Sequence, residues 1–476
     1  TKGRPPTALA VRFLLACRAG HHDDFPWIEY AHGRRPEGVC DKPQLQLNEL
    51  GAGGQAAEIE ARCRNCQANR RMSEAFGPEA GQHLPRCRGR HPHLGTASGD
   101  CDQEVRTILL GASNAWFPAT LTALSVPSQA GVLEQLVEDR WALLEPVTSE
   151  EVLGYALNAQ TELAKLREFD AEDVWKVIEA RRAGGGGDDE DESADLLRPE
   201  WEVLTDPSAA PSSEDFRLAE RAVPSAFSGA IEQVVLADRL REVVALVGFT
   251  RVDAPDETDP EGGRTPRAPI ARGAPGWVPC TEVRGEGIFL RFPEERVAEW
   301  EQRYGASERV SMLADAHHRW RVRRNLDPTL GLPAPRYLML HTLAHALIRE
   351  LALECGYGAA SIRERIYADV EAGDPMAGIL LYTAAPDSEG TLGGLVSLGE
   401  PDQLGRLLSQ ALERAALCSS DPLCSEHDPR DDGSVHGAAC HACQFSAETS
   451  CEQGNRFLDR AAIVGTFATP DLGYFA

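Results

Sequence analysis

The stretch Cys440-His441-Ala442-Cys443 lies near the end of this chain and decides how its last segment is held together. Two residues between a pair of cysteines allow both thiolates to turn toward one ion. Three further cysteines flank this pair, and a tetrahedral zinc ion needs only two more ligands. We therefore predict a closed, structural zinc site that uses four of these five residues: Cys418, Cys424, Cys440, Cys443 and Cys451.

A second cysteine-rich stretch lies near the start of the chain. Cys63-Arg64-Asn65-Cys66 repeats the two-residue spacing, and two more cysteines follow at distances typical of the second half of a zinc ribbon or treble-clef-like module. We predict that the N-terminal zinc ligands are Cys63, Cys66, Cys87 and Cys101.

Other potential ligands remain in the same region, and they can form a second N-terminal site. The possible ligands are Cys17, His21 and Cys40, with His32 beside them. For Cys17 and His21 a buried thiol and a capping histidine are an equally good interpretation.

The 13 cysteines also indicate a cellular compartment. An odd number of cysteines in a chain of 476 residues, without a secretory signal pattern, does not suit a disulfide framework. Clustered thiols are typical metal ligands in a reducing compartment, so we expect a cytoplasmic protein. Cys280 and Cys355 stand alone and are expected to be small buried side chains.

Charge argues against indiscriminate nucleic-acid binding. The formal net charge is −26, and a field of that sign repels phosphate. Two local stretches are nevertheless basic, and the second contains a tryptophan that can stack on bases. The candidate contacts to nucleic acid are Arg62, Arg64, Arg70, Arg71, Arg319, Arg321, Arg323 and Arg324. A solvated surface or a partner interface is the alternative interpretation.

The chain is long enough for several domains, and we predict a multidomain α/β (mixed α+β) fold with zinc-stapled modules at both ends. The expected segments are an N-terminal cysteine-rich zinc module (1–130), a helical segment (131–183), an acidic Gly-rich linker (184–199), a mixed α/β middle region (200–332) and a C-terminal zinc-binding domain (333–476). The first residues lack an initiator Met and a signal-peptide pattern, so we expect a trimmed or incomplete chain.

Within these segments, hydrophobic spacing predicts individual elements. Helices are expected at 231–244, 337–352 and 403–417, strands at 201–204, 287–292 and 378–383, and a loop at 253–275. No run of eighteen apolar residues exists, so no membrane span is expected.

Two motifs deserve a test for catalysis. His341 and His345 are one helical turn apart, as in zinc proteases, but Thr342 stands where those enzymes have a glutamate base. Glu350 and Glu354 can complete a metal site, whereas the apolar surroundings favour a buried helix with hydrogen-bonded histidines. The glycine-rich stretch 390–394 lacks the Lys of a phosphate-binding loop, and no Walker sequence occurs in the chain. We expect no ATPase activity from this chain alone.

Several stretches resemble a known family. The sequences 16–27 (Ala16-Cys17 to Pro26-Trp27) and 111–118 (Gly111 to Pro118) are similar to the N-terminal half of the DrmB family, the B subunits of the DISARM anti-phage defence system. The sequences 341–356, 418–424, 437–443 and 450–452 resemble its C-terminal domain. That domain carries a zinc-binding cysteine set and also occurs in some superfamily 2 helicases.

The resemblance implies a partner. DrmB-like proteins pair with the separate helicase DrmA, and the pair binds DNA and hydrolyses ATP in a DNA-dependent manner. This chain would then be the non-motor, non-enzymatic subunit, and its structural zinc would be held by the C-terminal cysteines. The alternatives are a metal-dependent hydrolase or nuclease that uses His341 and His345, and a purely protein-binding scaffold.

Overall fold

The short apolar run Gly378–Thr383 forms a strand that is buried along its whole length, β14. A strand of this kind needs neighbours on both edges and cover on both faces. β12 (Cys280–Arg291) and β13 (Ile362–Tyr367) pair with it on either edge, both antiparallel. The whole sheet has the order β10-β11-β12-β14-β13, with β9 paired to β11. The other strands are β9 (Phe117–Leu124), β10 (Arg217–Arg221) and β11 (Gln233–Thr250).

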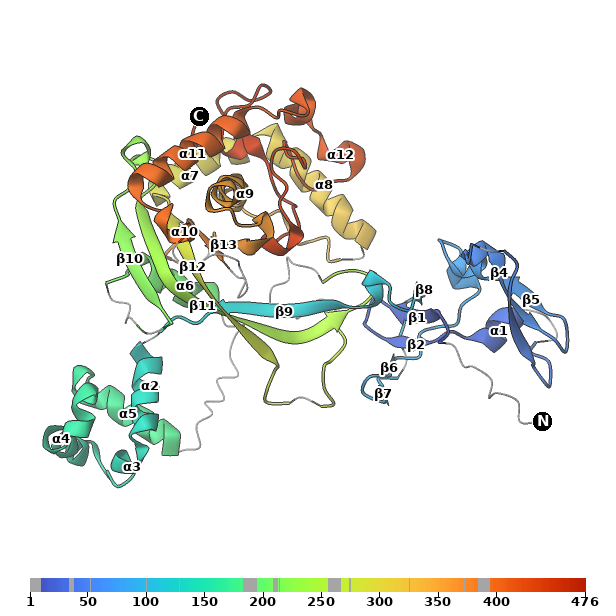
Figure 1. Ribbon diagram of the computed structural model, residues 1–476, viewed down its shortest axis with the longest axis horizontal. Helices are drawn as coiled ribbons and strands as arrows, with labels where there is room; N and C mark the ends of the chain where they lie inside the picture. The colour runs from blue at the N-terminus through green and yellow to red at the C-terminus, as the bar shows by residue number, and fades with distance from the viewer. Residues whose placement is uncertain are drawn as a thin grey trace. The chain divides into compact units, whose positions relative to one another are not determined.

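The computed structural model describes residues 10–33, 38–51, 53–99, 101–127, 129–182, 195–208, 213, 215–255, 267–273, 275–324, 326–370, 373–383 and 394–476. Most of the predicted acidic linker, part of the predicted 253–275 loop and residues 390–393 of the glycine-rich stretch lie outside these residues. The chain divides into unit 1 (residues 1–122 and 244–281) and unit 2 (residues 123–243 and 282–476) (Figure 1). The domain boundaries expected from the sequence stay predictions.

Unit 1 is built from short antiparallel strands. Its sheets are β2-β1-β8, β3-β4-β5 and the pair β6-β7. The bounds are β1 (Phe13–Cys17), β2 (His22–Asp24), α1 (Trp27–His32), β3 (Leu45–Glu49), β4 (Ile59–Cys63), β5 (Asn69–Arg71), β6 (Arg90–His91), β7 (Thr96–Ala97) and β8 (Val105–Leu109). One small apolar core, which includes Phe13, Tyr30 and Met72, joins α1 to the first two sheets. Strands this short gain little from their own pairing, so cross-links between segments are valuable here.

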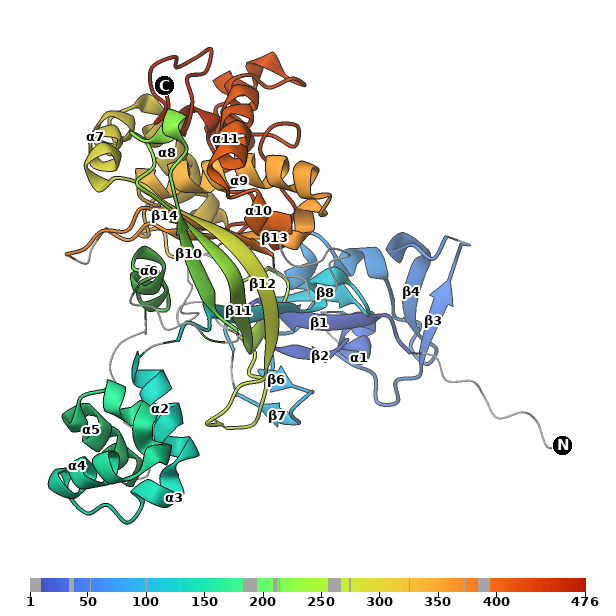
Figure 2. The same ribbon diagram turned by 60° about the vertical axis from the view of Figure 1, so that its left-hand side comes forward.

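In unit 2 the sheet has a helix on each face. Trp201 and Leu204 of α6 (Leu197–Thr205) pack with Phe289 and Leu380 on one face. The long helix α9 (Pro335–Cys355) packs on the other face. Figure 2 shows α6 and α9 on opposite sides of the strands. The main apolar core of the described residues therefore lies between α9 and the sheet.

Further helices surround α9, as Figure 1 shows. They are α7 (Glu294–Gly305), α8 (Glu308–Arg324), α10 (Gly394–Ser397), α11 (Pro401–Ala416) and α12 (Pro429–Asp432). A separate helical group with its own core consists of α2 (Gln129–Asp139), α3 (Trp141–Leu144), α4 (Glu150–Ala159) and α5 (Ala171–Arg182). No helix among the described residues is long and apolar enough to cross a membrane.

The mixed α+β class is confirmed, as are the helices expected at 337–352 and 403–417 and the strands at 287–292 and 378–383. Two expected elements are wrong. Residues 231–244 belong mainly to strand β11, and residues 201–204 belong to helix α6. In β11 a run of apolar residues is buried on both faces, so its spacing imitates a helix.

Candidate metal centres

Among the residues that the structure describes, four groups of side chains each bring four potential ligand atoms within 4.8 Å of one another. Each is named here after one member. They are the Cys17 cluster (Cys17, His21, Cys87, Cys101), the Cys63 cluster (His32, Cys40, Cys63, Cys66), the Cys440 cluster (Cys418, Cys424, Cys440, Cys443) and the His341 cluster (His341, His345, Glu364, Cys451). The first two lie in unit 1 and the others in unit 2.

The Cys440 cluster has the spacing of a tetrahedral thiolate site. Cys418 follows the end of α11, and Cys424 lies in a short 3-10 helix (Pro422–Glu426). The Sγ–Sγ distances are 3.7 Å for Cys418–Cys440, 3.8 Å for Cys424–Cys443 and 3.6 Å for Cys440–Cys443. Four sulfurs at about 2.3 Å from a central zinc ion are separated by about 3.8 Å. These three spacings are those of a zinc-bound set, and all four sulfurs lie within 4.8 Å of one another.

Within this cluster, the electrostatics favour a thiolate at Cys424, whereas burial raises the pKa of Cys440 and the neighbouring Cys424 raises that of Cys443. A hydrogen bond from Cys443 and the guanidinium of Arg460 lower the pKa of Cys424 to about 5. Arg460 is only 1% exposed, and its Nε donates to the carbonyl of Ala438 at 3.1 Å. A buried cation beside the cluster stabilises charged sulfur, which is the form that binds metal.

The Cys63 cluster forms where β4 ends. The amide of Cys63 donates to the carbonyl of Ala68 at 2.7 Å, and this bond closes the turn that holds Cys66. Backbone hydrogen bonds from Cys66, Gln44 and Asn65 lower the pKa of Cys63 to about 6. Cys40 Sγ lies 3.8 Å from Cys63 Sγ. The turn therefore presents thiols in the arrangement of a zinc knuckle.

His32 supplies the fourth group of this cluster. Its Nδ1 lies 2.7 Å from the carbonyl oxygen of Ile28, while its buried Nε2 has no hydrogen-bond partner. A histidine that binds metal through one nitrogen typically donates the other N–H in this way.

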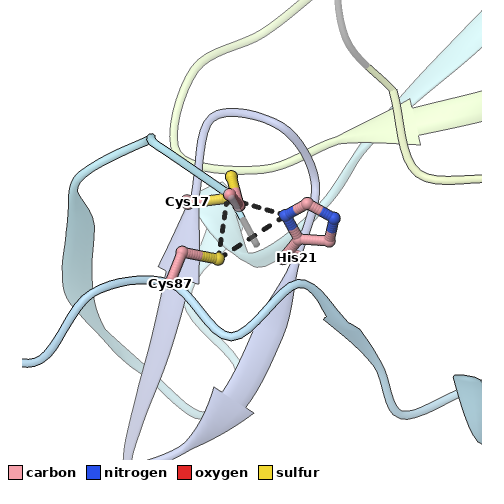
Figure 3. A group of neighbouring side chains, drawn as sticks. Cys17, His21 and Cys87 are labelled. Atoms are coloured by element: carbon pink, nitrogen blue, oxygen red, sulfur yellow. Dashed lines mark hydrogen bonds between the residues drawn. The ribbon is translucent and has the colours of Figure 1, made fainter. Parts of the chain in front are cut away.

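The Cys17 cluster lies at the β1–β2 turn, where Gly20 has a φ of +80°. Figure 3 shows Cys17, His21 and Cys87 pointing toward one another. Nδ1 of His21 lies 3.3 Å from Cys17 Sγ and 3.5 Å from Cys87 Sγ, and the two sulfurs are 3.6 Å apart. Nε2 of His21 lies 2.7 Å from the hydroxyl of Ser98, so Nδ1 is directed at the sulfurs. Cys101 completes the group.

The eight N-terminal residues weighed as ligands all lie in these two clusters, but their distribution differs from the predicted one. Cys63 and Cys66 lie with His32 and Cys40 rather than with Cys87 and Cys101. The reason is strand pairing, because β1 pairs with β8 and so carries Cys17 toward the segment around Cys101. Sequence spacing holds no information about that pairing.

Of the five C-terminal cysteines, Cys451 lies apart from the other four and joins the His341 cluster. Glu364 of β13 is the member that the sequence interpretation missed. A single glutamate in a strand has no spacing signal. Only the alternation of β13, which directs Glu364 to the side of α9, indicates its position.

The candidate DNA-contacting arginines do not share one environment. Arg64 and Arg71 are exposed and Arg62 is half-buried. Arg70 is ion-paired to Glu74 at 3.0 Å and lies over the ring of Tyr30. On α8, Arg319, Arg323 and Arg324 are exposed. Arg321 is 1% exposed, and its Nε donates to the carbonyl of Asp327. It therefore does not lie at the surface, where the predicted contact to nucleic acid would require it.

Comparison with known proteins identifies two domains. Residues 1–117 match a domain of unknown function, DUF8724. Residues 343–444 match the MrfA Zn-binding domain, so the chain carries a zinc-binding domain that includes all of the Cys440 cluster. A solved structure of the DUF1998 helicase MrfA bound to DNA is 10% identical and covers 46% of this chain and 23% of that chain. Its TM-score is 0.22, so this likeness carries no argument.

A curated relative matches almost the whole chain. It is the DISARM protein DrmB of Bacillus paralicheniformis, which is 33% identical over 471 residues, or 96% of this chain and 81% of the relative. This confirms the family resemblance of the sequence. The chain belongs to the family of the DISARM defence protein DrmB.

Proposed function

We propose that this chain is the cytoplasmic, non-motor subunit of an anti-phage defence complex. It pairs with a DrmA-like superfamily 2 helicase, helps that helicase to bind DNA and couples DNA binding to ATP hydrolysis. The observation that carries the proposal is the similarity to the DISARM protein DrmB along 96% of the chain. The sequence contains no Walker motif, which suits a subunit that depends on a separate motor.

Structural zinc is part of this proposal. The Cys440, Cys63 and Cys17 clusters each hold one zinc ion through the residues that define them. Each set offers four protein ligands, three or four of them cysteines, and such a set closes the coordination sphere of zinc. An ion of this kind supplies folding free energy rather than chemistry.

The zinc-stapled sheet of unit 1 provides the DNA contacts. Arg62 of β4 is aligned with Asn69, and Arg71 of β5 is aligned with Glu60. Alternation along the two strands therefore places Arg62 and Arg71 on the same face. Arg64 lies in the turn between Cys63 and Cys66. Among the described residues, no carboxylate is ion-paired to Arg62, Arg64 or Arg71, so their charge is available to phosphates.

The alternative of a hydrolase centred on His341 and His345 is disfavoured by burial. Both side chains are 0% exposed, as is Glu364. A hydrolytic metal needs an open position for water and a path for substrate. The DNA-affinity and ATPase measurements described next distinguish a purely protein-binding scaffold from our proposal.

The test is co-expression of this chain with its DrmA-like helicase, followed by co-purification. The ATPase rate of the helicase is then measured with and without DNA, in the presence and absence of this chain. We expect a stable complex whose ATPase is stimulated by DNA more strongly than that of the helicase alone. A complex with unchanged DNA affinity and unchanged ATPase would favour the scaffold, and failure to associate would refute the pairing.

A further inference from the structure

The His341 cluster is fully enclosed. His341 and His345 lie one turn apart on α9, Glu364 lies on β13, and Cys451 lies in the C-terminal segment. The two histidines are 0% exposed and Cys451 is 9% exposed. Burying ionisable groups is costly unless they are paired or bind a metal, so their convergence needs an explanation.

Each histidine has one ring nitrogen engaged and one left over. Nδ1 of His345 lies 2.9 Å from the carbonyl oxygen of Gln444, and Nε2 of His341 lies 3.1 Å from that of Arg456. The same Nε2 of His341 also lies 3.6 Å from Cys451 Sγ. A carbonyl only accepts, so these nitrogens carry the N–H. The other two nitrogens, His341 Nδ1 and His345 Nε2, are buried without a hydrogen-bond partner. Metal-binding histidines are oriented in this way, by a carbonyl on the nitrogen that does not bind the metal.

The free nitrogens point into the same space as Glu364. Oε1 of Glu364 lies 2.9 Å from His341 Nδ1 and 3.5 Å from His345 Nε2. Neither contact has hydrogen-bond geometry, and Oε2 of Glu364 also has no partner. The three side chains therefore converge on a common point.

Cys451 has the surroundings of a metal-bound thiolate. The amides of Asn455 and Gln453 donate to its sulfur at 3.1 Å and 3.4 Å. The neighbouring amide of Glu452 donates to Oε1 of Glu364 at 3.1 Å and holds the carboxylate in position. Backbone donors on a sulfur stabilise its charged form, which is the form that binds metal.

Charge balance completes the argument. The ion pairs of Glu364 in the described part of the chain are with the two imidazoles. A dication bound to two neutral imidazoles, one carboxylate and one thiolate gives a neutral centre, which burial penalises least. Nitrogen, sulfur and oxygen in a four-ligand set suit zinc, whereas iron sites with two histidines and one carboxylate keep open positions.

We propose that His341, His345, Glu364 and Cys451 bind a fourth, structural zinc ion. This ion joins α9, β13 and the C-terminal segment at the centre of unit 2, separately from the Cys440 cluster. His341 and Cys451 lie outside the residues that match the MrfA Zn-binding domain. The proposal concerns the isolated chain, so it stands whether or not the helicase pairing is correct.

The test is the zinc content of the purified full chain, measured by mass spectrometry of the metals. We expect about four zinc ions per chain in the wild type, about three in Cys451→Ala and about four in the control Cys355→Ala. Cys355 is a suitable control because it lies in the same unit but in none of the clusters. A folded Cys451→Ala protein with unchanged zinc content overturns the proposal.

A second measurement needs no variant. Anomalous diffraction from wild-type crystals at the zinc absorption edge locates each ion directly. We expect a peak among His341 Nδ1, His345 Nε2, Glu364 and Cys451 Sγ. The lack of such a peak, or a signal at the iron edge instead, refutes a zinc site there even if Cys451→Ala does not fold.

Discussion

Asp459 is a fully buried carboxylate at the junction of three segments. Nε and Nη2 of Arg309 donate to its two oxygens at 2.7 Å and 2.8 Å, and the hydroxyl of Tyr304 donates at 2.8 Å. The amide of Ala438, two residues before Cys440, donates to Oδ1 at 3.0 Å. Burial alone would raise the pKa of Asp459, but the charge and hydrogen bonds of Arg309 and the Tyr304 hydroxyl lower it. This residue therefore ties α7 and α8 to the segment that carries the Cys440 cluster.

Replacing Asp459 by Ala should destabilise unit 2 by about 3–5 kcal/mol, because it leaves the guanidinium of Arg309 buried without its carboxylate. It should also speed zinc loss from the Cys440 cluster, since the Ala438 amide loses its acceptor. Urea unfolding followed by tryptophan fluorescence measures the first effect, and zinc release to a chromogenic chelator measures the second. Asp471→Ala is the control, because Asp471 is exposed. A stability equal to that of the control would contradict this role.

At the residue scale, the sequence predicted which cysteines cluster better than it predicted how they group. The pairs Cys63–Cys66 and Cys440–Cys443, predicted from their two-residue spacing, each lie within one cluster. The partners of each knuckle come from other strands and helices, so they depend on tertiary pairing. Glu364 illustrates the limit, since nothing near it in the sequence distinguishes it from a surface glutamate.

At the scale of elements, consecutive residues of β13 contact helices on opposite faces of the sheet. Glu364 faces the α9 side, where it joins the His341 cluster, whereas Arg365 faces α6. Glu200 of α6 accepts hydrogen bonds from Nη2 of Arg365 at 2.7 Å, from the Tyr367 hydroxyl at 2.9 Å and from the amide of Leu124 at 2.7 Å. The alternation of a single strand thus separates the proposed metal ligand Glu364 from the buried ion pair of Arg365 with Glu200.

The substitution Glu200→Ala should destabilise the docking of α6 on the sheet by about 3–5 kcal/mol, because it removes the carboxylate from the buried Arg365. Zinc content should stay at the wild-type value, since Glu200 acts on the opposite face of β13. Thermal unfolding and metal analysis of the same sample check both points. Glu202→Ala, at an exposed position of the same helix, is the matched control. Loss of zinc in Glu200→Ala would show that the two faces are coupled.

The errors in predicting elements have a common cause. In β11, Val234, Val235 and Leu236 are consecutive and all buried, because this strand has cover on both faces. Hydrophobic periodicity distinguishes a helix from a strand only when one face of the element is exposed to solvent. The segment 201–204 is short, and the burial of Glu200 beside Trp201 results from an ion pair with another element. The helices α9 and α11 were predictable because they are long, and their apolar residues recur at helical spacing over several turns.

At the scale of the whole molecule, the net charge of −26 repels DNA, whereas the face of unit 1 that carries Arg62, Arg64 and Arg71 attracts it. Not all arginines of that region contribute, because Arg88 and Arg90 both pair with Asp23. Arg62, Arg64 and Arg71 have no ion-paired carboxylate among the described residues, and they are the arginines that we propose to face phosphate. An acidic chain with one basic face should bind DNA only where the partner holds the duplex against that face, since the remaining surface repels it.

The triple variant Arg62→Gln, Arg64→Gln and Arg71→Gln should weaken DNA binding by the complex with the helicase. Each phosphate contact that is lost should reduce the slope of log affinity against log salt concentration by roughly 0.7–0.9. The control is a variant with the same change in charge at three exposed positions elsewhere, Arg106→Gln, Lys165→Gln and Arg303→Gln. Fluorescence anisotropy of labelled DNA at several salt concentrations gives both slopes, and zinc content verifies that the Cys63 cluster is intact. Equal slopes for the two variants would mean that this face does not meet DNA, and that the basic residues of α8 or the helicase itself provide the contacts.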